Sequence, residues 1–306
     1  MTATPALSAA AAAAATLRVR HLTRYDYSAP VELAHHLAHL RPRETPWQTV
    51  SDWQIDVQPE PDAGARPIDA SVDVFGNWRL CFSHARVHDR LEVTSSFVAA
   101  LRRRPPHDAA SPPWEQVAAH LRYRAGSTMP DACEFALGSP YAPRAAPFAQ
   151  FAGDLFAPNR PLLDAAHALM QRVHEQFDYR CDITDVATDA LQALRLRRGV
   201  CQDFAHVMIS VCRSLGLAAR YVSGYLSTQP PPGQPRLVGS DASHAWVAVW
   251  CPANGWVDFD PTNDVRPALD HVTLAWGRDY GDVAPLRGVI RGGAARPEVR
   301  VTVEPV

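Results

Sequence analysis

The chain has 306 residues, of which 47% are hydrophobic and 20% are charged, and its formal net charge is −2. This composition is typical of a globular protein with two domains or one large domain. The near-neutral charge and the lack of an apolar run long enough to span a bilayer lead us to expect no nucleic-acid partner and no membrane partner.

The N-terminal residues 1–16 are rich in alanine, and the first basic residue of the chain is Arg18. Secretion signals carry positive charge ahead of an apolar core, so we interpret this segment as a disordered tail. The six cysteines form no CxxC pair, which argues against a zinc framework and suits free thiols in a reducing compartment. We therefore expect a cytoplasmic protein.

Residues 17–104 have the pattern of a β-rich N-terminal domain. Apolar and polar residues alternate in four stretches, of which the first breaks at Ala29-Pro30 and the third turns at Gly76-Asn77. Repeated strands separated by turns predict an antiparallel, sandwich-like domain. The four stretches are residues 17–28, 47–59, 70–83 and 90–101.

Residues 105–160 are rich in proline and alanine, and we interpret them as a linker and helical region with one helix at 114–123. A second globular unit, residues 161–290, begins with predicted helices at 161–180 and 188–195. Strands follow, and helices before strands predict an α+β domain. The strands of this unit are expected at 220–226, 244–250 and 255–260. Residues 291–306 contain a last strand whose sheet the sequence does not assign.

Cys201 stands where a glycine-containing approach passes into a strongly periodic helix that stops near Gly216. A thiol at a helix N-terminus lies beside unpaired N–H groups and the positive end of the helix dipole, and both favour the thiolate. Cys201 is therefore a candidate nucleophile, whereas Asp203, in the first turn, is expected to stabilise the helix. The apolar face of this helix is Phe204, Val207, Met208, Val211, Cys212 and Leu215.

A predicted hairpin supplies the imidazole and the orienting group that a thiolate nucleophile needs. His244 begins the alternating stretch SHAWVAVW, Asn254-Gly255 provides the turn, and WVDFD returns as far as Asp260. Partners across this turn have residue numbers that sum to about 504–506, so His244 lies opposite or diagonal to Asp260. Asp258 shares that face but lies nearer the turn, which makes it the weaker candidate.

Taken together, these segments resemble the transglutaminase-like superfamily, and more narrowly its bacterial proteins with a β-rich N-terminal domain. The resemblance implies a papain-like core with a catalytic Cys–His–Asp triad formed by Cys201, His244 and Asp260, and no metal or organic cofactor. The resembling motifs are GVCQDFAH, SLGLAARYVSGYL, SHAWVAVW and GWVDFDPTN, with GRDYGDVAPLRG near the C-terminus and RYDYSAPVELAHH and LRPR near the start.

The resemblance also implies acyl transfer at an amide bond. Cys201 would attack a carboxamide carbonyl, His244 would protonate the leaving amine, and water or an amine would resolve the thioester. The implied substrate is a peptide or protein with a carboxamide or isopeptide bond, and relatives of this type often accompany ATP-grasp-type peptide ligases. We favour a cysteine peptidase or amidase over a transamidase, because water is always available as the acceptor.

Two other functions stay open at this point. One is a non-catalytic peptide-binding module, although such domains usually lose triad residues and all three are present here. The other is an acyltransferase that uses a thioester donor, although no basic groove for the phosphates of coenzyme A is evident. His35 and His39 have the spacing of zinc ligands on a helix, but a β-rich region without a third ligand argues against a metal site.

Overall fold

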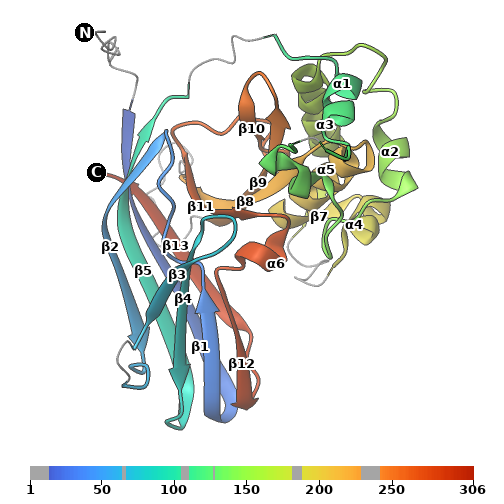
Figure 1. The fold of residues 1–306 in the computed structure, drawn as a ribbon. Coiled ribbons are helices and arrows are strands. Elements are labelled where there is room, and N and C mark those ends of the chain that lie inside the picture. The colour runs from blue at the N-terminus through green and yellow to red at the C-terminus, as the bar shows by residue number, and fades with distance from the viewer. Residues whose placement is uncertain (1–13, 64–66, 105–109, 127, 181–187, 229–241) are drawn as a thin grey trace, which may run out of the picture.

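The computed structural model describes residues 14–63, 67–104, 110–126, 128–180, 188–228 and 242–306. Two antiparallel sheets and a group of helices make up this part of the chain (Figure 1). Most of the predicted tail lies outside the described residues. Its last three residues, from Ala14, already belong to the first strand.

The first sheet has seven strands and curves into a half-barrel (Figure 1). Its order is β2-β5-β1-β4-β3, and β12 and β13 also pair with β1. The sandwich-like expectation was wrong, because the long strand β1 joins all of the N-terminal strands into one sheet. The strands are β1 (Ala14–Ala38), β2 (Gln48–Gln58), β3 (Asp69–Val72), β4 (Trp78–His84), β5 (His88–Arg102), β12 (Leu286–Gly292) and β13 (Pro297–Pro305).

Strand β1 does not end at Ala29-Pro30, as its sequence suggested. Its pairing with β5 shifts register between Asp26 and Val31, so the proline falls at an irregularity where no ladder hydrogen bond is lost. The first half of β1 pairs with β13 and the second half with β12. The C-terminal strand therefore belongs to the N-terminal sheet, and the predicted boundary at residue 290 falls inside β12.

The second sheet has the order β10-β9-β8-β11, and helices cover one of its faces (Figure 1). A short parallel pair, β6-β7, leads into α5. These strands are β6 (Asp178–Tyr179), β7 (Arg198–Gly199), β8 (Ala219–Leu226), β9 (Ala242–Cys251), β10 (Gly255–Phe259) and β11 (His271–Gly277). The helices are α1 (Trp114–His120), a 3₁₀ helix (Asp131–Ala136), α2 (Ala146–Ala152), α3 (Leu162–Gln176), α4 (Ala190–Leu196), α5 (Cys201–Ser214) and α6 (Tyr280–Val283).

Helix α5 is buried on all sides from Gln202 to Arg213, and not only along the apolar stripe that the sequence shows. The helix lies between the second sheet and the other helices, so its polar face is enclosed too. A separate core joins the two sheets, with Leu17 and Phe97 of the first packed against Tyr225 and Val272 of the second. This core fixes the N-terminal sheet beside the helical part of the protein.

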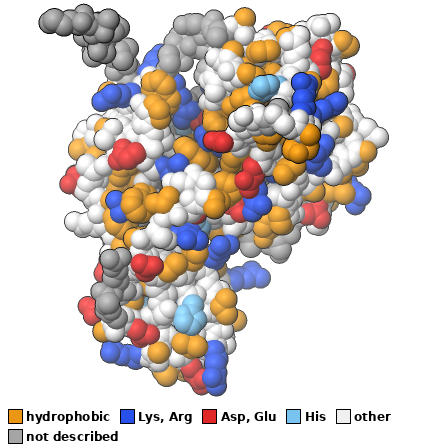
Figure 2. Space-filling view, in the orientation of Figure 1, with side chains coloured by type: hydrophobic (Ala, Val, Ile, Leu, Met, Phe, Trp, Pro, Cys, Tyr) orange, Lys and Arg blue, Asp and Glu red, His pale blue; other side chains and the backbone are white. Residues whose placement is uncertain are grey.

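Basic and acidic side chains are interspersed across the face shown in Figure 2, in keeping with the net charge of −2. Among the described residues, none of the helices combines the length and the apolar character that a membrane crossing needs.

Candidate active site

Cys201 is the first residue of α5, and the turn before it is tightly fixed. The carboxylate of Asp203 accepts a hydrogen bond from the Val200 N–H at 2.8 Å, so Asp203 has a structural role at the start of the helix, which it caps. The turn also requires glycine at position 199, because a Cβ there would lie 2.3 Å from Asp203 Oδ2. The half-buried thiol is thereby held at the positive end of a buried helix.

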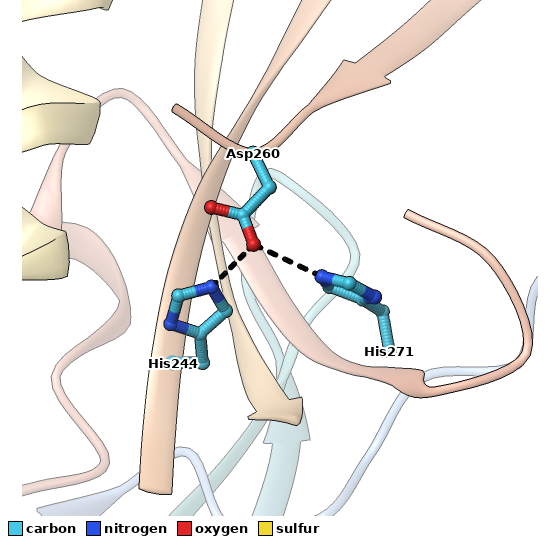
Figure 3. A group of neighbouring side chains, drawn as sticks. All are labelled: His244, Asp260 and His271. Carbon is cyan, nitrogen blue, oxygen red and sulfur yellow. Dashed lines mark hydrogen bonds and ion pairs between the residues drawn. The ribbon is translucent and has the colours of Figure 1, made fainter. Parts of the chain in front are cut away.

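The β9–β10 hairpin brings His244 to Asp260. Phe259 pairs with Val247, so the residue numbers of partners sum to the upper end of the expected range and Asp260 lies diagonal to His244. His244 Nε2 hydrogen-bonds Asp260 Oδ2 at 2.7 Å (Figure 3). The pairing predicted from the alternation alone is therefore present.

His244 and Cys201 line one cavity, where the imidazole and the thiol interact. Since Nε2 is engaged by Asp260, Nδ1 is the nitrogen that serves the thiol, and it points away from Asp260 in Figure 3. Burial alone would lower the pKa of His244, but the hydrogen bond to Asp260 and the interaction with Cys201 outweigh burial and raise it to about 10. The imidazole is thus held ready as an acid.

Asp260 is fully buried and is held as an anion by five donors. One oxygen accepts hydrogen bonds from the backbone N–H groups of Thr262 and Asn263. The other accepts from His244, from the Asn263 amide at 2.7 Å and from His271 at 3.1 Å. Burial opposes ionisation, yet these bonds hold the pKa of Asp260 well below its usual range.

His271, at the start of β11, is the site residue that the sequence reasoning missed. Its Nε2 bonds Asp260 and its Nδ1 bonds Asp270 Oδ1 at 2.7 Å. Burial lowers the pKa of His271, but the two carboxylates outweigh burial and raise it. Because a carboxylate only accepts, both nitrogens carry protons and the ring is a cation. No spacing rule ties a residue on β11 to the β9–β10 hairpin, so the pattern gave no signal.

Asp258, the weaker candidate, does not contact His244. It accepts a hydrogen bond from Trp246 Nε1 at 3.0 Å and forms an ion pair with Arg104. The ring of Trp246 packs against both His244 and His271, so Asp258 supports the site through a tryptophan.

The cavity beside Cys201 and His244 has a volume of about 250 Å³ and one wall from the N-terminal sheet. Strand β1 contributes His21, Thr23 and Tyr25 to this wall, and β13 contributes Pro297 and Val299. Residues that are distant in sequence therefore build one cleft. The remaining wall consists of Val200, Gln202, Tyr221, Ser223, Ser243, Ala245, Tyr280, Pro285 and Leu286.

Among the described residues that line this cavity there is no arginine, aspartate or glutamate. His21 is neutral at pH 7, because burial lowers its pKa to about 4. Its ring nitrogens hydrogen-bond the Tyr225 hydroxyl at 3.0 Å and the Thr23 hydroxyl at 2.8 Å. The charge of His244 is paired with Asp260, so the cleft suits an uncharged substrate group.

By donor type and proximity, His244, Asp260 and His271 form the group among the described residues that could hold a metal ion. Their donor atoms are already joined to one another by hydrogen bonds, with both imidazole Nε2 atoms on one carboxylate oxygen (Figure 3). Short contacts of this kind share protons, so we interpret the group as an acid–base network. His35, which lies in β1, bonds Ser83 and shares no helix with His39.

Comparison with protein families identifies both parts of the chain. Residues 149–261 match the Transglutaminase-like superfamily, and residues 17–100 match the Bacterial transglutaminase-like N-terminal region. Uncharacterized protein Rv2569c of Mycobacterium tuberculosis is 36% identical over 297 residues, which cover 94% of this chain and 92% of the relative. ML0607 of Mycobacterium leprae is 33% identical over 94% of this chain and 97% of the relative.

One further sequence match and one structural match are to proteins whose names state an activity. A Protein-glutamine gamma-glutamyltransferase of Pseudomonas aeruginosa is 38% identical over 104 residues, 33% of this chain and 16% of that protein. The crystal structure of a proposed cysteine protease from Cytophaga hutchinsonii superposes with a TM-score of 0.74 at 19% identity, covering 96% of this chain and 91% of that one. This superposition shows that the two-part fold is shared along nearly the whole chain.

Proposed function

Because this chain belongs to the transglutaminase-like superfamily, we propose that it is a thiol enzyme that transfers the acyl group of an amide through Cys201, His244 and Asp260. The observation that carries the proposal is a thiol at the start of a buried helix that shares one cavity with an imidazole, which a buried carboxylate orients. This is the arrangement that activates a cysteine nucleophile.

In the proposed reaction, Cys201 Sγ attacks the amide carbonyl carbon, and the Cys201 backbone N–H stabilises the resulting oxyanion. His244 Nδ1 then gives its proton to the amide nitrogen, the C–N bond breaks, and a thioester and a free amine result. His244 next takes a proton from water, the hydroxide attacks the thioester, and the acid and the thiol are released. Asp260 keeps the imidazole in one orientation throughout.

We favour water over an amine as the acceptor. A lysine ammonium would need an acidic group to receive it, and no described aspartate or glutamate lines the cavity. The name of the Pseudomonas relative supports the amine as the alternative acceptor. The substrate is then a peptide with a carboxamide or isopeptide bond, and an ATP-grasp-type ligase is the candidate source of such a peptide. The five described cysteines are free, which supports a reducing, cytoplasmic location.

Mass spectrometry of the full chain with a mixed peptide and isopeptide library, with and without a primary amine, tests the proposal. Cys201→Ala is the blank. Products that gain water only identify a hydrolase, and amine adducts made by wild type alone identify a transamidase.

Alkylation by iodoacetamide separates a wrong library from a wrong proposal. Rapid labelling of Cys201 without turnover means that the substrate was absent from the library. No turnover together with labelling as slow as that of an ordinary thiol contradicts the enzyme proposal and supports a binding module.

A further inference from the structure

Arg220 is a buried cation without a hydrogen-bonding anion. Its side chain, on β8, stacks on two indole rings, with Cζ 3.7 Å from the centre of Trp276 and 4.3 Å from that of Trp256. The residue is only 9% exposed, and its Nε is buried with no hydrogen-bond partner. A buried charge is costly unless it is hydrogen-bonded, so this guanidinium calls for an acceptor that the described chain does not provide.

Arg220 borders a cavity of about 440 Å³ that is separate from the one beside Cys201. Arg220 and Val222 line this cavity, whereas Tyr221 and Ser223 line the other, so the two lie on opposite faces of β8. The segment from Thr45 to Trp47, between β1 and β2, closes one side. The cavity therefore lies at the seam between the N-terminal sheet and the second sheet.

The charge around this cavity is unbalanced in favour of cations. Asp258 is its one carboxylate among the described lining residues, and it already pairs with Arg104 and accepts from Trp246. Burial lowers the pKa of Arg220 to about 9, Asp258 opposes that shift, and Arg43 and Arg104 add to it. Arg220 is still a cation at neutral pH, and it forms no ion pair with a described carboxylate.

The aromatic lining narrows the kind of anion that would fit. Three indole rings, those of Trp47, Trp256 and Trp276, border the same space as Arg220. A planar carboxylate matches the fork of guanidinium N–H donors, and its single negative charge would balance the charge of Arg220. Arg43 and Arg220 already stack on Trp276, so a flat or apolar body would pack on the indole of Trp47.

We propose that this cavity binds a small aromatic monocarboxylate, whose carboxylate accepts hydrogen bonds from Arg220 and whose ring packs on Trp47, since the guanidinium groups of Arg43 and Arg220 already lie over Trp276. Because the ligand would bridge the N-terminal segment and the second sheet, it stabilises the folded chain as a whole. The proposal does not depend on the activity of Cys201, since the two cavities open on opposite faces of β8.

Isothermal titration of the full chain with benzoate, with its uncharged isostere benzamide and with inorganic phosphate tests the proposal. We expect saturable binding of benzoate at one site, a rise in melting temperature with benzoate, and binding of benzamide and phosphate at least about tenfold weaker. No saturable binding of benzoate, or equal binding of benzamide, overturns the carboxylate site. If phosphate binds as tightly as benzoate, the proposed role of the aromatic ring in ligand binding is wrong.

Variants locate the site. Arg220→Lys keeps a cation above the indoles but loses the planar fork, and we expect benzoate affinity to fall at least about fivefold. Arg220→Gln is expected to abolish the binding. Arg300→Gln, at an exposed arginine on β13, is the matched control and should bind as wild type. Unchanged affinity in Arg220→Lys contradicts the proposal, and this variant remains informative if Arg220→Gln does not fold.

Discussion

Asp260 Oδ2 accepts hydrogen bonds from two imidazoles at once, at 2.7 Å from His244 and at 3.1 Å from His271. The second imidazole is itself held by Asp270 at 2.7 Å (Figure 3 shows the first three residues). A row of alternating acid and base groups therefore runs from the cleft toward the half-exposed Asp270. His271 is a positioning residue in this row, because it reaches His244 only through Asp260.

Replacing His271 by Gln removes a cationic donor from Asp260 and frees that carboxylate to attract the His244 proton more strongly. We expect kcat/KM to fall about 10- to 100-fold, the range for losing a hydrogen bond to a buried charge, and its alkaline limb to move to higher pH. The check is a pH profile of kcat/KM. Asp270→Asn keeps the His271–Asp260 bond and should change the rate much less. If the alkaline limb of the pH profile stays in place in His271→Gln, His271 is not a positioning residue.

The raised pKa of His244 sets the alkaline limit of the reaction. The ordinary pKa of histidine is 6.5 and that of His244 is about 10, so its stabilising contribution is complete below pH 6.5 and is lost as pH rises through about 10. We expect amide cleavage to stay high through neutral pH and to fall near pH 10, because the acid for the leaving amine is then lost. Iodoacetamide labelling of Cys201 needs no such acid and should not fall there. Parallel loss of both rates would indicate unfolding instead.

Asp260 and Asp258 differ by two residues but have separate roles, which a matched pair of variants tests. Asp260→Asn is expected to lower the turnover rate by about 10³- to 10⁴-fold, because the imidazole loses its orienting carboxylate. Asp258→Asn disturbs Arg104 and Trp246 and is expected to lower the melting temperature while turnover changes by less than about tenfold. Turnover rates and melting temperatures of both variants, measured in parallel, test this difference. Equal losses of turnover rate in both variants would contradict a specific role of Asp260 in orienting His244.

The cleft, whose His244 cation is already paired with Asp260, predicts selectivity for neutral substrate groups. A substrate with a carboxamide side chain at the acyl position should exceed its carboxylate analogue in kcat/KM by about 100-fold or more, because an unpaired charge would be buried. Competition between matched glutamine and glutamate peptides measures the ratio. A ratio near one would show that a charge-compensating group outside the described residues reaches the cleft.

Position 199 requires glycine because the side chain of Asp203 lies close to it. In Gly199→Ala, the new Cβ would lie 2.7 Å from the Cβ of Asp203, so the helix cap must shift. We expect a loss of stability of about 1–3 kcal/mol, together with slower labelling of Cys201. Gly153→Ala is the control, since its Cβ would meet its nearest atom at an ordinary 3.5 Å. Denaturant unfolding compares the two, and an unchanged midpoint for Gly199→Ala would contradict the account.

The sequence by itself determined the parts of the site that depend on local geometry. Helical periodicity placed Cys201 at the start of a helix, and strand alternation about a two-residue turn signal placed His244 opposite or diagonal to Asp260, as α5 and the β9–β10 hairpin show. Both inferences need only the 3.6-residue and two-residue repeats of regular structure, so a short stretch of chain suffices.

The tertiary structure decided which distant segments join that local frame. His271 reaches Asp260 from another strand, β1 and β13 wall the cleft from opposite ends of the chain, and Arg220 meets Trp276 across the second sheet. These contacts depend on sheet order and on the docking of one sheet against another, which apolar alternation does not encode. Alternation specifies which face of a strand is buried, but the partner of that face is selected by the packing of the whole core.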